Sequence, residues 1–188
     1  MTLISIITEA LITMGRSTDA QSMEAWKDKL TIFANDGAKA IAEYLQLRKT
    51  ETITAEDGQI DIRNLSNTCI KVCKVEQDGS ELTFNQGPDS NHVDVGAVGD
   101  VSVEYRYLPD NMAEDIDTPG IPEHLHRILV PYVIYREHMT ADPTMQRRSD
   151  MFYQEYRSML KDAKKTLGEI NTYTIKNAGW FRCQAQQY

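Results

Sequence analysis

The chain has 188 residues, enough for one domain that can bury roughly 70% of the surface exposed by its unfolded form. Hydrophobic residues make up 41% and charged residues 26%, which is typical of a soluble globular protein, and no apolar run approaches the ~20 residues of a membrane span. The formal net charge of −8 argues against nucleic acid as a tightly held ligand, because phosphate binding depends on clustered Lys and Arg.

The first part of the sequence predicts two helices. Residues 2–14 are apolar, lack a basic start and contain Glu9, so they indicate a short helix rather than a signal peptide. A second helix is predicted over 23–48, with Ser22 as its cap, because apolar side chains recur mostly three and four residues apart. One face of this helix would carry Trp26, Leu30, Phe33, Gly37, Ile41, Tyr44 and Leu45.

The sequence from about 50 to 108 changes to a period of two and predicts a small antiparallel β insertion. Asp78-Gly79 between two alternating runs is the commonest hairpin chemistry. The last strand would place four side chains on one face: Val101, Val103, Tyr105 and Tyr107. Residues 85–100 are rich in Gly, Asp and Asn and predict a mobile loop.

The sequence after 120 predicts an αα-hairpin. One helix covers about 122–139 and opens at Pro122, where the missing N–H of proline costs nothing. Asp142 would cap the next helix, which runs over about 143–168, and so short a connection makes the two helices antiparallel. The apolar face of the last helix carries Met145, Phe152, Tyr156, Met159, Ala163, Leu167 and Ile170. Its opposite face carries Arg147, Arg148, Glu155, Lys161, Lys164 and Lys165.

The predicted fold class is therefore α+β and mainly α: a helical bundle with a small antiparallel β insertion. Residues 1–170 would form a single domain, and 171–188 an extended C-terminal arm, because the helical pattern lapses after Gly168. Aromatic side chains are costly to leave in water, so we expect the arm to dock on a neighbouring molecule rather than fray. The predicted partner-binding residues are Tyr173, Ile175, Trp180, Phe181 and Tyr188.

Three of the four histidines lie in 122–139, but their spacing argues against a metal site. His124 and His126 differ by about 200° around a helix, and His138 lies about 21 Å further along its axis. Solvated or interface-facing imidazoles are predicted instead. Pro131 should kink this helix, and the apolar residues around it predict burial, either by the same domain or by neighbouring subunits.

No catalytic, cofactor or metal site is predicted elsewhere, since the sequence has no G-x-S-x-G elbow and no P-loop. Cys69 and Cys73 would be about 13 Å apart on one strand, too far for a disulfide, and we interpret them as reduced, semi-buried thiols rather than a metal pair.

The acidic residues ahead of the hairpin do not have the spacing of an EF-hand loop, and they predict a solvated linker that caps the following helix. They are Glu114, Asp115 and Asp117. A ligand-binding module or small enzyme is the least favoured alternative; it would use the β-insertion residues His92, Asp94 and Asp100.

The order of these parts resembles the head–tail adaptor (connector) proteins of tailed bacteriophages. In that family a final strand with tyrosine and proline at its end leads, through a short acidic linker, to a proline that opens an apolar helix. A short Asp-containing turn then precedes the last helix. The matching residues are Tyr105 or Tyr107 with Pro109, then Asp115 and Asp117, Pro122, Asp142, Phe152, Tyr153 and Tyr156, and the resemblance covers about residues 2–170.

The resemblance implies a structural virion protein without catalytic activity or cofactor. It implies a homo-oligomeric ring, commonly of twelve copies, at the head–tail junction, with the portal protein and a tail or next neck-ring protein as partners. DNA would cross the channel without specific binding, which suits an acidic chain. The protein would occupy the host cytoplasm during assembly and then the virion. Another neck or tail-completion ring protein is the alternative in the same class.

Overall fold

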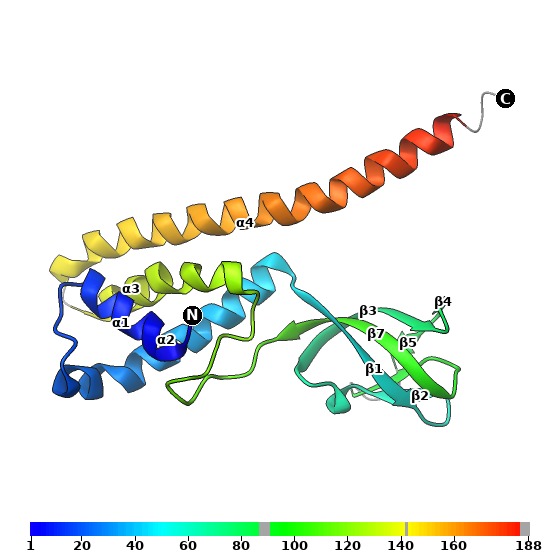
Figure 1. Ribbon diagram of the computed structural model, residues 1–188, viewed down its shortest axis with the longest axis horizontal. Coiled ribbons are helices and arrows are strands. Elements are labelled where there is room, and N and C mark those ends of the chain that lie inside the picture. Colours follow the sequence, from blue (N-terminus) through cyan, green and yellow to red (C-terminus); the bar gives the residue numbers. More distant parts are fainter. Residues whose placement is uncertain (87–90, 142, 185–188) are drawn as a thin grey trace.

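The computed structural model describes residues 1–86, 91–141 and 143–184. The fold is α+β, as predicted. Its helices gather at one end of the molecule and its strands at the other, and one long helix crosses the helical end and continues past it (Figure 1). The helices are α1 (Leu3–Thr13), α2 (Ala20–Leu45), α3 (Leu129–Thr140) and α4 (Pro143–Gln184), with short 3-10 helices η1 (Ile62–Asn64) and η2 (Glu123–Ile128). Within the described residues, none of these helices is long and apolar enough to cross a membrane.

All strand pairs are antiparallel and form two small sheets. The strands are β1 (Arg48–Ala55), β2 (Gln59–Asp61), β3 (Thr68–Gln77), β4 (Ser80–Leu82), β5 (Asn85–Gln86), β6 (His92–Asp94) and β7 (Gly99–Leu108). The four-stranded sheet has the order β1-β7-β3-β4, and the three-stranded sheet has the order β2-β6-β5. The predicted hairpin turn is confirmed: Asp78 and Gly79 join β3 to β4, and both have positive φ.

Strand β7 lies in the middle of the larger sheet and carries the β part of the core. Its alternation is confirmed, since Val101, Val103, Tyr105 and Tyr107 are all buried. Strand β3 alternates only in part, because its register against β7 shifts twice, between Cys69 and Lys71 and again between Val72 and Lys74. Each shift is typical of a β-bulge, which changes which side chains face inward. Val72 and Val75, three residues apart, are therefore both buried.

Helix α2 begins and ends slightly earlier than predicted. Its N-cap is Asp19 rather than Ser22: the carboxylate of Asp19 accepts the backbone N–H of Ser22 at 2.8 Å. The helix ends at Leu45, Gln46 adopts a left-handed conformation, and Arg48 already belongs to β1. Asp19 and Ser22 are both good capping residues, and the sequence pattern did not decide between them.

Helix α3 crosses α2 at close range. A Cβ at Gly37 of α2 would lie 2.7 Å from Cδ1 of Tyr132 and 3.0 Å from Cδ2 of Leu129, both on α3. Only glycine therefore fits at this crossing without a shift of its neighbours, although alanine is the better helix former.

The predicted helix over 122–139 is two elements, and the predicted kink at Pro131 is wrong. Residues 123–128 form η2, and α3 starts at Leu129, so Pro131 lies in the first turn of the α-helix. Proline is tolerated there because the first N–H groups of a helix have no intrahelical acceptor. Pro122 precedes η2 as its N-cap residue rather than opening an α-helix.

Helix α4 is longer than predicted. It packs antiparallel along α3 and continues as one helix to Gln184, so the predicted end near residue 168 and the extended conformation of the arm are wrong (Figure 1). Gly168 costs only about 1 kcal/mol within a helix, and the sequence has no proline between 144 and 184 to break it. Asp142, the predicted cap of this helix, lies outside the described residues.

Candidate functional site

The apolar run that forms η2 and α3 is covered by the chain's own helices. Helices α1, α2 and α4 all pack against α3. The buried residues of the run are Leu125, His126, Ile128, Leu129, Val130, Pro131, Tyr132, Val133, Ile134, Glu137 and His138. The sequence left open whether its own domain or a neighbouring subunit buries this run, and the structure shows cover within one copy. This run is therefore not exposed for contact with another copy, and such a contact would use the outer faces of these helices.

Two of the three clustered histidines are buried, so the predicted solvated or interface-facing positions are wrong for them. His126 is 5% exposed, and its Nε2–H donates to the backbone carbonyl of Ile121 at 2.8 Å. His138 is 4% exposed and lies edge-on to the ring of Phe152. Burial lowers the pKa of His138, because the charged imidazolium loses its hydration. His124 is exposed, as predicted.

The acidic linker caps α1, the first helix of the chain, instead of the helix that follows the linker. Backbone carbonyls of Asp117 and Asp115 accept the N–H groups of Leu3 and Ile4 at 2.8 and 3.2 Å. The carboxylate of Asp117 accepts two backbone N–H groups of its own loop, at 2.8 Å each, and these bonds lower its pKa. The linker thus supplies acceptors to helix donors that would otherwise lack them.

Side chains of α2 hold the same linker from the other side. The amide of Asn35 donates to the carbonyl of Met112 at 3.0 Å and accepts its N–H at 2.8 Å. Lys27 forms an ion pair with Asp115 at 2.7 Å, and the hydroxyl of Tyr107 donates to the carbonyl of Gly120 at 3.0 Å. The connection between the sheet and η2 is therefore fastened to two helices, which limits independent motion of the β part.

The three polar residues of the alternative ligand-binding site lie on two different sheets. His92 and Asp94 lie on β6 of the smaller sheet, where Asp94 accepts a hydrogen bond from Gln59 at 2.6 Å. Asp100 lies on β7 of the larger sheet and accepts one from Thr54 at 2.8 Å. These cross-strand hydrogen bonds engage the carboxylates of Asp94 and Asp100 within the sheets.

The described part of the chain contains no group of three or more His, Cys, Asp or Glu residues placed to hold a metal ion. Cys69 and Cys73 are half-buried free thiols on β3, as predicted. Burial raises the pKa of Cys69, and a thiol with a raised pKa is a poor nucleophile at neutral pH.

A carboxylate on β1 links three parts of the β region. Glu51 accepts hydrogen bonds from the hydroxyls of Tyr105 and Ser66, from the backbone N–H of Ser66, and from Lys49 at 2.7 Å. Burial alone would raise the pKa of Glu51, but these four donors lower it to about 2. Burial, together with this acceptor, raises the pKa of Tyr105 to about 12.

We expect Glu51→Gln to lower the free energy of unfolding by about 1–3 kcal/mol near neutral pH. The folded pKa of about 2 lies below the ordinary value of 4.5. The stabilisation is therefore complete above about pH 4.5 and is lost as the pH falls towards 2. Urea denaturation curves of the wild type and the variant should converge over that range. Glu56→Gln, at an exposed position just past the strand, is the control, and a gap that persists unchanged at pH 2.5 would contradict the assignment.

A second buried carboxylate joins the helices. Glu137 on α3 is 1% exposed, and its Oε1 lies 3.2 Å from Nη2 of Arg16, in the connection between α1 and α2, and 3.9 Å from Nζ of Lys29 on α2. The guanidinium of Arg16 also stacks over the ring of Trp26, 3.9 Å from its centroid. The buried ion pair and the stacked guanidinium therefore link the α1–α2 connection, α2 and α3.

The first part of α4 lies on α3 through aromatic pairs. The ring centroids of Tyr132 and Tyr156 are 5.0 Å apart, and those of Tyr135 and Tyr153 are 4.8 Å apart. Packing against the core is described as far as Leu167. Beyond this point the helix projects away from the other helices and the sheets (Figure 1).

The predicted partner-binding residues fall on this projecting part. Tyr173, Ile175, Trp180 and Phe181 lie within α4, but their side chains are outside what the structure describes. Tyr188 lies outside the described residues altogether. The role of all five residues therefore stays a prediction, while the backbone of Tyr173, Ile175, Trp180 and Phe181 is helical rather than extended.

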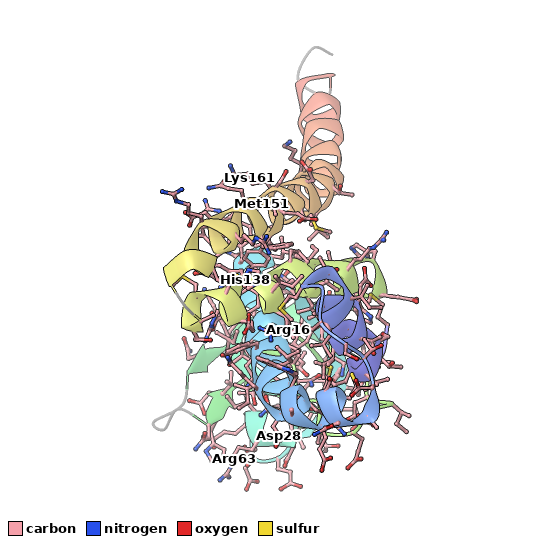
Figure 2. All side chains as sticks on the ribbon, turned by 90° about the vertical axis from the view of Figure 1, so that its left-hand side faces the viewer. Arg16, Asp28, Arg63, His138, Met151 and Lys161 are labelled. Carbon is pink, nitrogen blue, oxygen red and sulfur yellow. The ribbon has the colours of Figure 1, made fainter. Side chains whose placement is uncertain are left out.

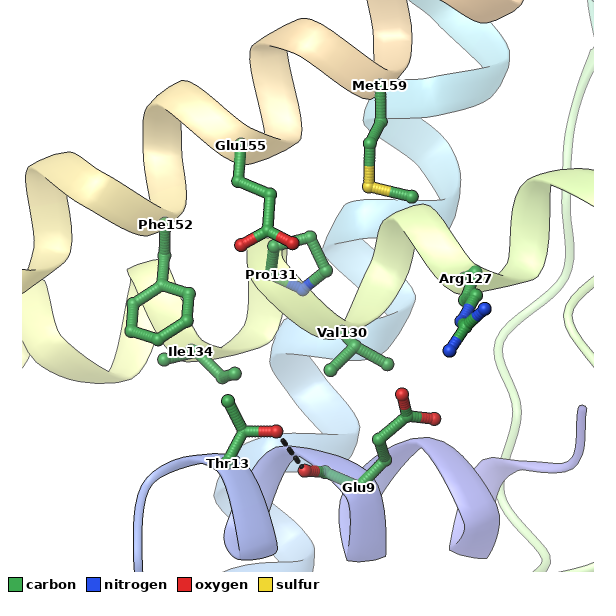
Figure 3. A pocket seen from close by; sticks show the side chains of 9 residues that line it. All are labelled: Glu9, Thr13, Arg127, Val130, Pro131, Ile134, Phe152, Glu155 and Met159. Carbon is green, nitrogen blue, oxygen red and sulfur yellow. Dashed lines mark hydrogen bonds between the residues drawn. The ribbon is translucent and has the colours of Figure 1, made fainter.

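An open groove of about 310 Å³ lies between α1, α3 and α4 (Figure 3). Its apolar wall is formed by Val130, Ile134 and Phe152, and the carboxylates of Glu9 and Glu155 approach it from opposite sides. Thr13 Oγ1 donates to the backbone carbonyl of Glu9 at 2.8 Å, so this hydroxyl is occupied within α1. Apolar walls with a charged rim suit a side chain of another protein. Sequence periodicity could not reveal the groove, because it depends on how three helices pack.

The family model described as SU10 adaptor protein matches residues 1–175. No curated protein matches the chain. The family match covers α1 to α3, the β insertion, the linker and most of α4, and it ends before Trp180 and Phe181.

Proposed function

Because the chain belongs to the SU10 adaptor protein family, a family of structural head–tail adaptors of phages, we propose that it forms a homo-oligomeric ring at the head–tail junction. The proposed ring contains twelve copies, binds the portal protein on one side and a tail or neck protein on the other, and surrounds the channel through which DNA passes. The protein assembles in the host cytoplasm and remains in the virion.

The projecting end of α4 is the observation that supports this proposal most directly. The helix has 42 residues, or about 63 Å, and about 25 Å of it extends beyond the last described packing residue, Leu167. Isolated helices are marginal in water, and most helix stability in proteins comes from packing. A projecting helix with Trp180 and Phe181 in its sequence is therefore suited to burial against another protein, and we propose the portal as that partner.

The charge of the chain suits a wall that DNA must pass. The net charge is −8, and residues 51–120 contain fifteen Asp and Glu against four Lys and Arg. An acidic channel wall repels the phosphate backbone and prevents DNA from being held during ejection. The excess of carboxylates therefore supports a channel position for part of the β region.

Electron microscopy of the purified protein, alone and mixed with isolated portal rings, tests the proposal. We expect single copies or small oligomers alone, and a second ring-shaped layer on portals in the mixture. Portals from a phage with an unrelated neck serve as the control for non-specific stacking. Protein that does not bind its matched portal at roughly micromolar concentrations contradicts the proposed position.

A further inference from the structure

One side of α4 carries a stripe of positive charge. Arg157, Lys161 and Lys165 follow one another at intervals of four residues, so they are neighbours along the helix, and all three are exposed. The buried face of the same helix, which includes Tyr156, packs towards α3. Lys161 lies on the side of α4 turned away from α3 (Figure 2). We call Arg157, Lys161 and Lys165 the basic stripe.

The basic stripe is only partly neutralised within its own chain. Lys165 pairs with Asp162 at 3.1 Å, and Arg157 donates to the hydroxyl of Tyr153. Within the described residues, Lys161 has no carboxylate within 4 Å. Like charges four residues apart on a helix destabilise it by a few tenths of a kcal/mol per pair. The stripe therefore carries a small cost that an acidic partner would offset.

The outer side of α2 has the opposite charge. Glu24, Asp28 and Ile32 follow one another at intervals of four residues on this helix, and all three are exposed. Glu114, in the linker that Asn35 and Lys27 hold against α2, is also exposed. In the part of the chain that the structure describes, none of these three carboxylates has a Lys or Arg nitrogen within 4 Å. We call Glu24, Asp28 and Glu114 the acidic α2 face.

One cation lies within the acidic α2 face, and it already has a partner. Nζ of Lys27 lies 2.7 Å from a carboxylate oxygen of Asp115. This hydrogen bond, together with the charges of Asp115, Glu114 and Asp28, raises the pKa of Lys27. The connection between β7 and η2 contains no Lys or Arg, and Lys29, the next lysine of α2, faces α3. Negative charge therefore remains in excess on this face.

Each of the two surfaces also exposes apolar side chains. Ile32 on α2 is 59% exposed, and Ile116 in the linker is 81% exposed. Met151 on α4 is 59% exposed and lies, like Lys161, on the side of the helix turned away from α3 (Figure 2). Apolar side chains surrounded by charged ones are typical of protein interfaces. Both surfaces therefore have the composition of a contact with another protein.

The two surfaces lie on opposite sides of the helical end. Helix α3 packs on both α4 and α2, and Figure 2 shows Lys161 above this helix and Asp28 below it. The basic stripe and the acidic α2 face therefore do not neutralise each other within one copy. Two different surfaces of one chain that attract each other form a head-to-tail contact, and repetition of such a contact by rotation closes a ring.

We propose that the basic stripe of one copy docks on the acidic α2 face of a second copy. This inference rests on the proposed ring and names the surfaces that form it. Met151, Ile32 and Ile116 supply the apolar centre of the contact. The charges act around this centre, where they set the register and speed of assembly and make both sensitive to salt.

Charge reversal tests the pairing. Lys161→Glu/Lys165→Glu and, separately, Glu24→Lys/Asp28→Lys should each weaken ring formation roughly tenfold or more, as measured by mass photometry of the full chain at low salt with matched portals present. Reversal of both surfaces in one chain should restore rings. An equal mixture of the two singly reversed proteins should also restore them, with the two kinds of copy alternating. Glu56→Lys/Glu81→Lys, at exposed positions of the β part, makes the same change in charge and is the matched control.

The outcomes separate this inference from the proposed function. Wild-type rings that are insensitive to both reversals overturn the pairing and leave the ring intact. Rings that either reversal abolishes, and that neither the double reversal nor the mixture restores, also overturn the pairing. Wild-type protein that forms no ring under any condition overturns both proposals. A stripe variant that assembles normally but loses retardation of DNA in a gel assigns the stripe to DNA. Circular dichroism of each variant confirms that the fold is unchanged.

Discussion

Deletion of residues 171–188 is expected to leave the fold intact and to reduce binding to portal rings by roughly 100-fold or more, since aromatic anchors often contribute 2 kcal/mol or more each. Core packing of α4 is described through Leu167, and its buried anchors Phe152, Tyr156 and Leu160 all precede the cut. The deleted part contains Trp180 and Phe181, the largest apolar side chains of the projecting helix. Thermal melts measure the fold, and co-sedimentation with portal rings measures binding.

Point variants distinguish the contribution of the aromatic anchors to portal binding from the contribution of helix length. Trp180→Ala/Phe181→Ala should reproduce most of the loss, whereas Lys176→Ala and Gln184→Ala in the same segment should cause little. A deletion that removes the cooperative thermal transition would show that the segment belongs to the core. A deletion that leaves portal binding unchanged would require another portal surface, and the groove beside Val130 and Phe152 would be the next to test.

Local patterns in the sequence predicted the elements well because they depend on near neighbours. The Asp78-Gly79 turn, the alternation of β7 and the helical spacing along α2 each follow from backbone preferences and from burial of one face. The same patterns predicted helix ends wrongly where neighbouring residues favour different ends. Asp19 and Ser22 both suit a helix cap, and Gly168 weakens a helix without ending it.

Burial was harder to predict, because it depends on residues far away in the sequence. Nothing near His126 or His138 indicates that α1, α2 and α4 cover them, so imidazoles that looked solvated are buried. Pro131 appeared to interrupt a helix because the change from η2 to α3 at Leu129 has no sequence signature of its own. The bulges of β3 likewise follow from its pairing with β7 and not from its own alternation.

The features of the candidate site could also be predicted only where they depend on local sequence or composition. The family resemblance and the charge asymmetry could be read from the sequence, and the family is confirmed. The hydrogen bonds around Glu51 could not, because Ser66 and Tyr105 lie far from it in the sequence. The linker bonds of Asn35 and Lys27 also join residues far apart in the sequence, and they fasten the β part to the helices.

Arg16→Ala is expected to lower the free energy of unfolding by about 2–4 kcal/mol. Glu137 is 1% exposed and the guanidinium of Arg16 is its closest partner, so removal of this group leaves a buried carboxylate with Lys29, 3.9 Å from Oε1, and the imidazole of His138, 3.8 Å from Oε2. The variant also loses the stacking of Arg16 on Trp26. Urea denaturation at pH 7 measures the change, and Lys165→Ala, which breaks an exposed ion pair with Asp162, is the control, expected to cost under about 0.5 kcal/mol.

A second substitution distinguishes the buried charge from lost packing. Glu137→Gln in the Arg16→Ala background should recover about 1–2 kcal/mol, because a neutral amide is far less costly to bury without a cation. No recovery would assign the loss to the contact between Arg16 and Trp26. A cost for Arg16→Ala no larger than for the control would show that Glu137 does not depend on Arg16, with Lys29 and His138 as its remaining neighbours. Because Arg16 joins the α1–α2 connection to α3, the full effect should also weaken the packing of α1 on α3, and faster hydrogen exchange in α1 than in α2 would reveal it.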